Sequence, residues 1–160
     1  MDTDDRPART ALDPRLDSPV DRPLDPRGDR VHLVLPPSSE FLRTVRLVAA
    51  DAAMRSGCDL DDVEDFRIAV DELSHLLMTS TDHSVHVTFA SFDGQVRARG
   101  SARARPGASG TLDKVSAMIV RATADEHHIV TEAGEVTFDV VKRARRGADD
   151  VASTRLASPS

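Results

Sequence analysis

Hydrophobic and polar residues follow one another in short periodic runs between residues 31 and 143. The first run, residues 31–35 (VHLVL), is typical of a β-strand, and two prolines end it. Between residues 40 and 56 apolar side chains recur every three or four positions, which predicts a helix, and Gly57 marks its end. The periodic part of the chain therefore begins with a strand followed by a helix.

A second helix is predicted to begin after Asp59. Asp61 and Glu64 have the spacing of a capping box, in which two side chains satisfy N–H groups of the first helical turn. The apolar residues that follow are spaced by three and four positions, which predicts one continuous buried stripe. These residues are Val63, Phe66, Val70, Leu73 and Leu77.

Two hairpins and a third helix are predicted in the second half. Residues 84–92 and 95–102 read as strands joined at an Asp-Gly pair, and residues 128–132 and 135–142 read as strands joined at an Ala-Gly pair. Between them Thr111 is predicted to cap a helix that runs to about residue 124. The residues of this helix that are predicted to face inward are Leu112, Val115, Met118, Ile119 and Ala122.

The order strand, helix, helix, hairpin, helix, hairpin predicts an α+β fold. Its expected form is a two-layer sandwich, with three helices on one face of a mixed, mostly antiparallel sheet of about five strands. Residues 31–143 are expected to form this single domain. Residues 1–30, rich in Pro, Asp and Arg, and residues 144–160 are expected to be disordered because they hold too few apolar side chains to offset the entropy of ordering.

Composition excludes several classes of function. A net charge of −6, with no Trp and no Tyr, argues against binding to nucleic acid, which requires a basic surface and often aromatic stacking. No apolar run approaches the roughly 18–20 residues that span a bilayer, and the N-terminus lacks the apolar segment of a secretory signal, so a cytoplasmic protein without a membrane partner is expected. The single cysteine, Cys58, is interpreted as a loop thiol of ordinary character.

Two groups of residues have the side chains of a catalytic or metal-binding site, but their spacing argues against such a site. Ser74, His75 and Glu72 lie on one predicted helix, where adjacent positions point some 100° apart and so do not face each other as a catalytic triad requires. His127 and His128 lie on one predicted strand, where successive side chains point to opposite faces. No metal site is therefore expected.

Residues 60–73 (LDDVEDFRIAVDEL), together with the order of elements, resemble the anti-sigma-factor serine-protein kinases of bacteria. These proteins belong to the histidine kinase-like (GHKL, or Bergerat-fold) ATPase superfamily. The resemblance covers nearly the whole predicted domain and extends to a final hairpin that ends in a basic residue, here Lys142. It implies a sigma factor or an anti-anti-sigma protein as partner, a homodimer, and ATP with Mg²⁺ as ligands.

The chain departs from the motifs by which this family binds nucleotide. The resemblance places the family's catalytic base at Glu72, but at the position of its magnesium-binding Asn, four residues later, stands Leu76, which has no oxygen to offer a hard cation. The family's Asp-x-Gly-x-Gly motif falls on residues 97–107, which contain no Asp. Before the third helix only Gly107 and Gly110 remain of a glycine-rich phosphate loop.

The expected function is that of an anti-sigma-factor-like regulator acting by protein–protein contact in bacterial transcription control. ATP binding is expected to be weakened or lost, with no cofactor and with Glu72 as a vestigial catalytic residue. The alternative is an active ATP-binding serine/threonine-protein kinase of an anti-anti-sigma partner. It would use ATP and Mg²⁺ in a rewired site that combines Glu72 with the arginines of one predicted strand region, Arg97, Arg99, Arg103 and Arg105. Otherwise these arginines are interpreted as a solvent-exposed face of the strand. A third possible function is that of a structural module without a sigma partner.

Overall fold

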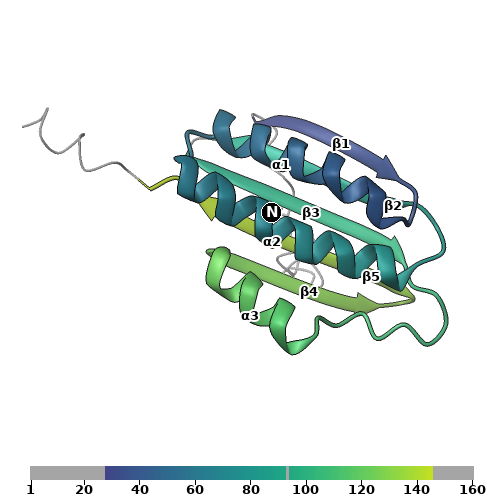
Figure 1. The fold of residues 1–160 in the computed structure, drawn as a ribbon. Helices are drawn as coiled ribbons and strands as arrows, with labels where there is room; N and C mark the ends of the chain where they lie inside the picture. The colour runs from purple at the N-terminus through teal and green to yellow at the C-terminus, as the bar shows by residue number, and fades with distance from the viewer. Residues whose placement is uncertain (1–27, 93, 146–160) are drawn as a thin grey trace, which may run out of the picture.

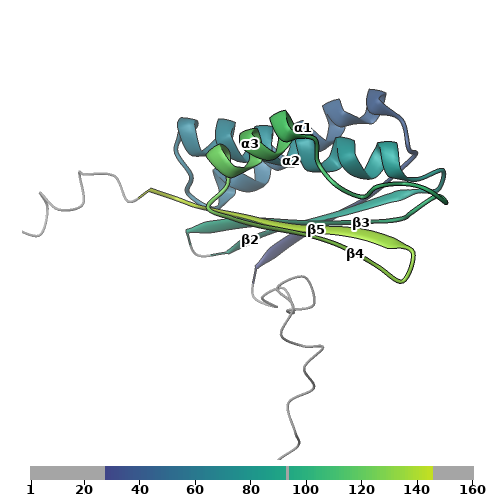
Figure 2. The same ribbon diagram turned by 90° about the horizontal axis from the view of Figure 1, so that it is seen from below.

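Five strands form one sheet, and three α-helices cover one of its faces (Figures 1 and 2). The structure is a computed structural model that describes residues 28–92 and 94–145. In chain order the elements are β1 (Asp29–Leu35), a 3₁₀ turn (Ser39–Phe41), α1 (Leu42–Arg55), α2 (Leu60–Ser80), β2 (Val85–Phe92), β3 (Gln95–Arg103), α3 (Lys114–Thr123), β4 (Glu126–Glu132) and β5 (Glu135–Arg143).

The strand order is β1-β2-β3-β5-β4, and each of these neighbouring pairs is antiparallel. The last strand in the chain, β5, therefore lies between β3 and β4 and not at the sheet edge. The predicted α+β fold class is confirmed, although the described pairings make the sheet antiparallel throughout and not mixed. Strand β1 begins at Asp29, two residues before the expected start of the domain.

Strand alternation divides the sheet into an inner face under the helices and an outer face away from them. The inner face carries Phe89 of β2 and Phe138 of β5, which are 1% and 0% exposed, and Phe66 of α2 packs on it at 0%. Figure 2 shows the helices above the sheet, with the outer face pointing the opposite way. Because apolar burial provides most of the favourable free energy of folding, these residues form the structural centre of the domain.

Both capping predictions for the later helices were wrong. Helix α2 is capped by Asp59, whose side chain accepts a hydrogen bond from the Asp62 backbone N–H at 2.8 Å, and not by a box of Asp61 and Glu64. Helix α3 begins two residues later than predicted, because Asp113 and not Thr111 is its N-cap. At α3 the aspartate has an advantage over Thr111, because its carboxylate also interacts favourably with the positive end of the helix dipole. At α2 the helix begins directly after Asp59, as predicted, so this residue occupies the cap position.

Helix α3 faces the sheet with a different side from the one predicted. Val120 is fully buried, whereas Val115 and Met118 are 61% and 65% exposed and Ala122 is also exposed. The helix is apolar on two sides and lies at the edge of the helical layer, beside α2 (Figure 1). Only one side of such a helix has a sheet to pack on, so apolar spacing alone does not identify the buried one.

Gly100, at the centre of β3, is a position where any side chain would collide with the core. A Cβ atom there would lie 2.2 Å from Cε1 of Phe138 and 2.8 Å from Cδ1 of Leu77. Gly100→Ala is therefore expected to lower the free energy of unfolding by about 1–3 kcal/mol through overpacking, as measured by urea denaturation. Ser101→Ala, on the outer face of the same strand, is the control and should change it by less than about 0.5 kcal/mol. Equal values for the two variants would contradict this account of the β3 packing.

In the described part of the chain no helix combines the length and the apolar character needed to cross a bilayer. The two expected disordered segments fall mostly on residues 1–27 and 146–160, which lie outside the described residues, as does Asp93 of the first predicted turn.

Candidate functional site

Glu72 and Leu76 lie one helical turn apart on α2 but in different surroundings. Leu76 is 7% exposed and belongs to the hydrophobic core. Glu72 is half-buried and lines a surface pocket of ≈ 240 Å³ at the junction of α1 and α2, together with Arg46, Arg67, Ile68 and Asp71. Leu76 therefore fills its position with a packed hydrocarbon side chain.

The pocket beside Glu72 holds charges that are already engaged. Nε of Arg46 lies 2.9 Å from Oδ1 of Asp71, and Arg67 pairs with Glu64 one turn earlier on α2. Burial raises the pKa of Asp71 above its ordinary value, and the nearby guanidinium of Arg46 only partly opposes this. These neighbours form two ion pairs across and along the helices.

The ten-residue connection between β3 and α3 is fastened to the rest of the domain. The Ala104 N–H donates to the Gly134 carbonyl at 2.8 Å, and the Arg105 N–H donates to the Ser80 carbonyl at 2.8 Å. Gly110 has a φ of +60° and lies so close to Thr131 that a Cβ atom would approach its Oγ1 to 2.3 Å. The connection thus lies directly on the β4–β5 hairpin and the end of α2.

The N-terminus of α3 is filled by a carboxylate of the protein itself. Oδ1 of Asp113 accepts hydrogen bonds from the N–H groups of Val115 and Ser116 at 2.8 and 2.9 Å. The bond from the Ser116 N–H is the main reason why the pKa of Asp113 is held below its ordinary value, so the group is charged at neutral pH. A phosphate at this helix end would meet a negative charge and two donors that are already in use.

A second pocket lies under this connection, between α3 and β4, with a volume of ≈ 390 Å³. Its lining is Ser109, Gly110, Thr111, Leu112, Ala117, His127, Ile129 and Thr131. Burial lowers the pKa of His127, so its ring is neutral at pH 7 and none of the lining side chains offers a positive charge. Such a pocket is suited to a small neutral molecule and not to a triphosphate.

The predicted arginine face and Glu72 do not form one site. Arg97 and Arg99 point to the outer face, where both bind Asp139 of β5, and Glu72 lies in the helical layer on the other side of the sheet. Nε of Arg97 is 2.7 Å from Oδ1 of Asp139, and Nη2 of Arg99 is 2.9 Å from Oδ2. The structure therefore does not bring Glu72 together with Arg97 and Arg99, because the sheet separates them.

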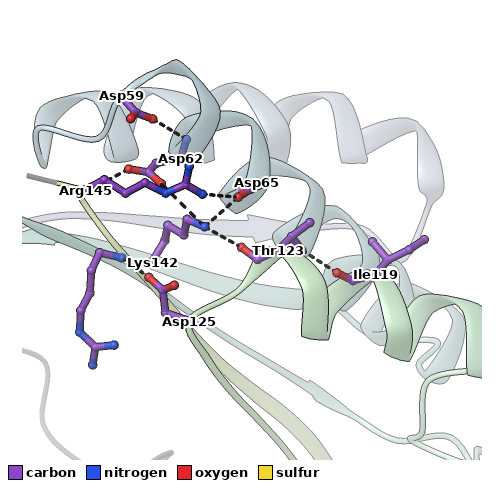
Figure 3. Close-up of polar contacts among 9 residues, drawn as sticks. Asp59, Asp62, Asp65, Ile119, Thr123, Asp125, Lys142 and Arg145 are labelled. Atoms are coloured by element: carbon purple, nitrogen blue, oxygen red, sulfur yellow. Dashed lines mark hydrogen bonds and ion pairs between the residues drawn. The ribbon is translucent and has the colours of Figure 1, made fainter. Parts of the chain in front are cut away.

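A cluster of ion pairs joins the start of α2 to the end of β5 (Figure 3). Nζ of Lys142 lies 2.8 Å from Oδ2 of Asp65 and 3.8 Å from Oδ1 of Asp62, and it donates to the Thr123 carbonyl at 3.2 Å. Arg145 completes the cluster, since its backbone N–H donates to Oδ2 of Asp62 at 2.9 Å. Its Nε also lies 3.1 Å from Oδ1 of Asp62, without the alignment of a hydrogen bond. Asp62 is fully buried and the Lys142 side chain is 5% exposed.

This ion-pair cluster was missed by sequence reasoning, but a signal for it exists. Alternation along β5 places Val136, Phe138, Val140 and Lys142 on the same inner face, so the lysine needs a buried anion. Asp62 and Asp65 are three residues apart and share one helix face. The cluster joins α2, α3 and β5, and each of its carboxylates lies within ion-pair distance of Lys142 and Arg145.

The remaining candidates do not assemble into a reactive group. Ser74 is buried and its hydroxyl has no hydrogen-bond partner, whereas His75 is exposed. His127 and His128 point to opposite faces of β4. Burial and the nearby Asp62 raise the pKa of Cys58 to about 11, which keeps it a thiol at neutral pH. Within residues 28–92 and 94–145, no three His, Cys, Asp or Glu side chains form a group that could hold a metal ion.

The fold of this chain is similar to that of solved structures. No protein-family model and no curated protein sequence matches the chain. The chain is similar to the crystal structure of the RsbU and RsbW domains of Rv1364c from Mycobacterium tuberculosis, with 26% sequence identity and a TM-score of 0.60. The match covers 75% of this chain and 34% of that one, so this chain corresponds to about a third of its neighbour.

Proposed function

We propose that this chain is a cytoplasmic regulatory protein of the anti-sigma type, and that it acts by binding a sigma factor or an anti-anti-sigma protein. Two facts support the proposal. The segment 60–73 resembles the anti-sigma-factor kinases, and the fold is similar to a structure that contains an RsbW domain, a domain of that kind. A homodimer is expected by analogy with the family.

We further propose that nucleotide binding is weakened or lost in this protein. The observation that carries this part is the Asp113 carboxylate at the N-terminus of α3, where the family resemblance would place phosphate. The core position of Leu76 supports it, because a packed leucine gives Mg²⁺ no oxygen ligand. Each missing charge-assisted hydrogen bond costs about 1.5–3 kcal/mol, and every 1.4 kcal/mol is about tenfold in affinity. Two such losses move a micromolar site to the millimolar range.

Calorimetric titration of the full chain with Mg·ATP and Mg·ADP tests this proposal. We expect dissociation constants of about 1 mM or weaker for both nucleotides. The matched variant is Asp113→Ser, which keeps a capping hydroxyl but removes the negative charge, and it should bind more tightly than the unmodified chain. A dissociation constant in the low micromolar range for the unmodified chain would refute the loss of nucleotide binding.

An active serine/threonine-protein kinase remains the second candidate, because Glu72 is retained and is partly accessible to solvent. This function would require transfer of phosphate from ATP to a serine of an anti-anti-sigma partner and loss of that transfer in Glu72→Ala. The positions described above weigh against it, since Glu72 lines a different pocket from the one beneath the β3–α3 connection.

A further inference from the structure

The outer face of the sheet is basic over β1, β2 and β3. Its outward positions on these three strands include Arg30, His32, His86, Arg97, Arg99 and Arg103 and no carboxylate. The acidic residues of the outer face, Asp139 among them, all lie on β4 and β5. Arg97 and Arg99 share one carboxylate, that of Asp139, so basic side chains outnumber acidic ones on this half of the face, which favours a ligand with spaced negative charges.

One row across this face alternates between basic and apolar side chains. The strand register aligns Arg30 of β1, Ala90 of β2, Arg97 of β3 and Val141 of β5. Neighbouring strands are about 4.8 Å apart, so the two arginines of the row are about 10 Å apart. Ala90 and Val141 are only 7% and 4% exposed although no described helix covers this face. The longer side chains of the neighbouring strands flank these two small residues, Arg97 on both of them and Glu126 on Val141.

The sequence before Gly28 has a matching pattern. It contains four consecutive tetrapeptides, each beginning with an apolar residue followed by aspartate and each containing one proline. They are Leu12-Asp13-Pro14-Arg15, Leu16-Asp17-Ser18-Pro19, Val20-Asp21-Arg22-Pro23 and Leu24-Asp25-Pro26-Arg27. In an extended polyproline-type chain, which rises about 3.1 Å per residue, aspartates four positions apart are separated by about 12 Å. This spacing is close to that of the arginines in the row.

We propose that residues 12–27 bind to the outer face of the sheet of their own chain, with their aspartates on its arginines and their apolar residues over Ala90 and Val141. A proline in every tetrapeptide prevents the segment from continuing the sheet through a backbone hydrogen-bond ladder, so side chains make the contacts. The segment joins the domain at Gly28, whose Cα lies so close to β2 that a Cβ atom would approach the Ser91 carbonyl to 2.7 Å. The covalent link gives the segment a high effective concentration at this face.

The test uses the full chain with the substitutions Cys58→Ser and Ser18→Cys and a nitroxide label at position 18. Methyl NMR signals of Ala90 and Val141 are expected to be lost through paramagnetic broadening and to return when the nitroxide is reduced. Leu47 on α1 and Val115 on α3, both exposed on the opposite side of the domain, are the reference methyl groups and should keep their signals. Broadening of the reference groups instead, or of none of the four, would overturn the proposal.

Two further measurements test whether the contacts are ionic and whether the segment belongs to the same chain as the face it binds. Replacing Asp13, Asp17, Asp21 and Asp25 by Asn should restore the Ala90 and Val141 signals, whereas replacing Asp2, Asp4 and Asp5 by Asn should not. Unchanged broadening in the first variant would rule out the ionic contacts on which the proposal rests.

The second measurement mixes two kinds of chain, one with the nitroxide and no isotope label and one with the isotope label and no nitroxide. All methyl signals should stay intact in this mixture. Signal loss in the mixture would mean that the segment binds a second copy, contrary to the proposal.

Discussion

Lys142→Met is expected to lower the free energy of unfolding by about 3–5 kcal/mol, a large part of the 5–15 kcal/mol typical of a domain. The substitution removes the cation that faces Asp62 and Asp65, and this cation is itself only 5% exposed. Asp62 is fully buried, and among the described residues its charge would keep only Arg145 as an ion-pair partner. The loss of stability arises because a buried carboxylate loses its partner, and not because the ion pair itself contributes that much free energy. Urea denaturation followed by circular dichroism measures it.

The neighbouring residue supplies the control for this prediction. Arg143 pairs with Glu126, but the two side chains are 51% and 47% exposed, so Arg143→Met should cost at most about 1 kcal/mol. The double variant Lys142→Met with Asp65→Asn should be less destabilised than the sum of the two single variants, since both remove the same interaction. Equal losses of unfolding free energy in Lys142→Met and Arg143→Met would contradict this prediction. Strict additivity in the double variant would also contradict it, because Lys142 and Asp65 would then not interact.

Leu76→Asn is expected to lower the free energy of unfolding by about 2–5 kcal/mol and not to strengthen the binding of Mg·ATP. The leucine is 7% exposed and packed in the core, so the variant loses apolar contacts and buries an amide. Restoring the family's asparagine does not remove the Asp113 carboxylate from the N-terminus of α3. Urea denaturation gives the stability, and thermal unfolding with and without Mg·ATP gives the binding.

Leu76→Met, which nearly conserves volume, is the matched variant and should cost less than about 1.5 kcal/mol. A melting temperature that rises with Mg·ATP in Leu76→Asn, and not in Leu76→Met, would mean that one residue controls the nucleotide site. The proposed role of the α3 cap would then be wrong.

The order and type of the elements could be predicted because each has a clear local signal. The closing hairpin is an example. Its Ala-Gly pair adopts φ values of +51° and +76° at Ala133 and Gly134, which suit a tight turn between twisted strands. Helix α2 is a second example, because its apolar stripe continues over about four turns and places Phe66, Val70, Leu73 and Leu77 at the core.

The candidate site was less accessible to prediction because it depends on contacts between distant residues. The choice between two apolar sides of α3 is made by the sheet beneath Val120 and not by the helix itself. The i and i+4 spacing of Glu72 and Leu76 was read correctly as two neighbouring positions, but their burial depends on packing from α1, α3 and the sheet. The Asp139 pair with Arg97 and Arg99 required the register of β3 on β5, which joins residues some 40 positions apart.

The place of β5 in the sheet also affects how the protein can fold during synthesis. This strand supplies the hydrogen-bonding partner of both β3 and β4 and carries Lys142 to α2, yet it is the last of the described strands to leave the ribosome. Until β5 emerges, the nascent chain has an unpaired strand edge at β3, and Asp62 lacks its cationic partner Lys142. The elements that precede β5 are therefore only marginally stable at this stage. Folding of the domain is therefore completed only once residue 145 has left the exit tunnel. Chains that are released before this point expose an unpaired strand edge, to which chaperones or other unfolded chains can bind.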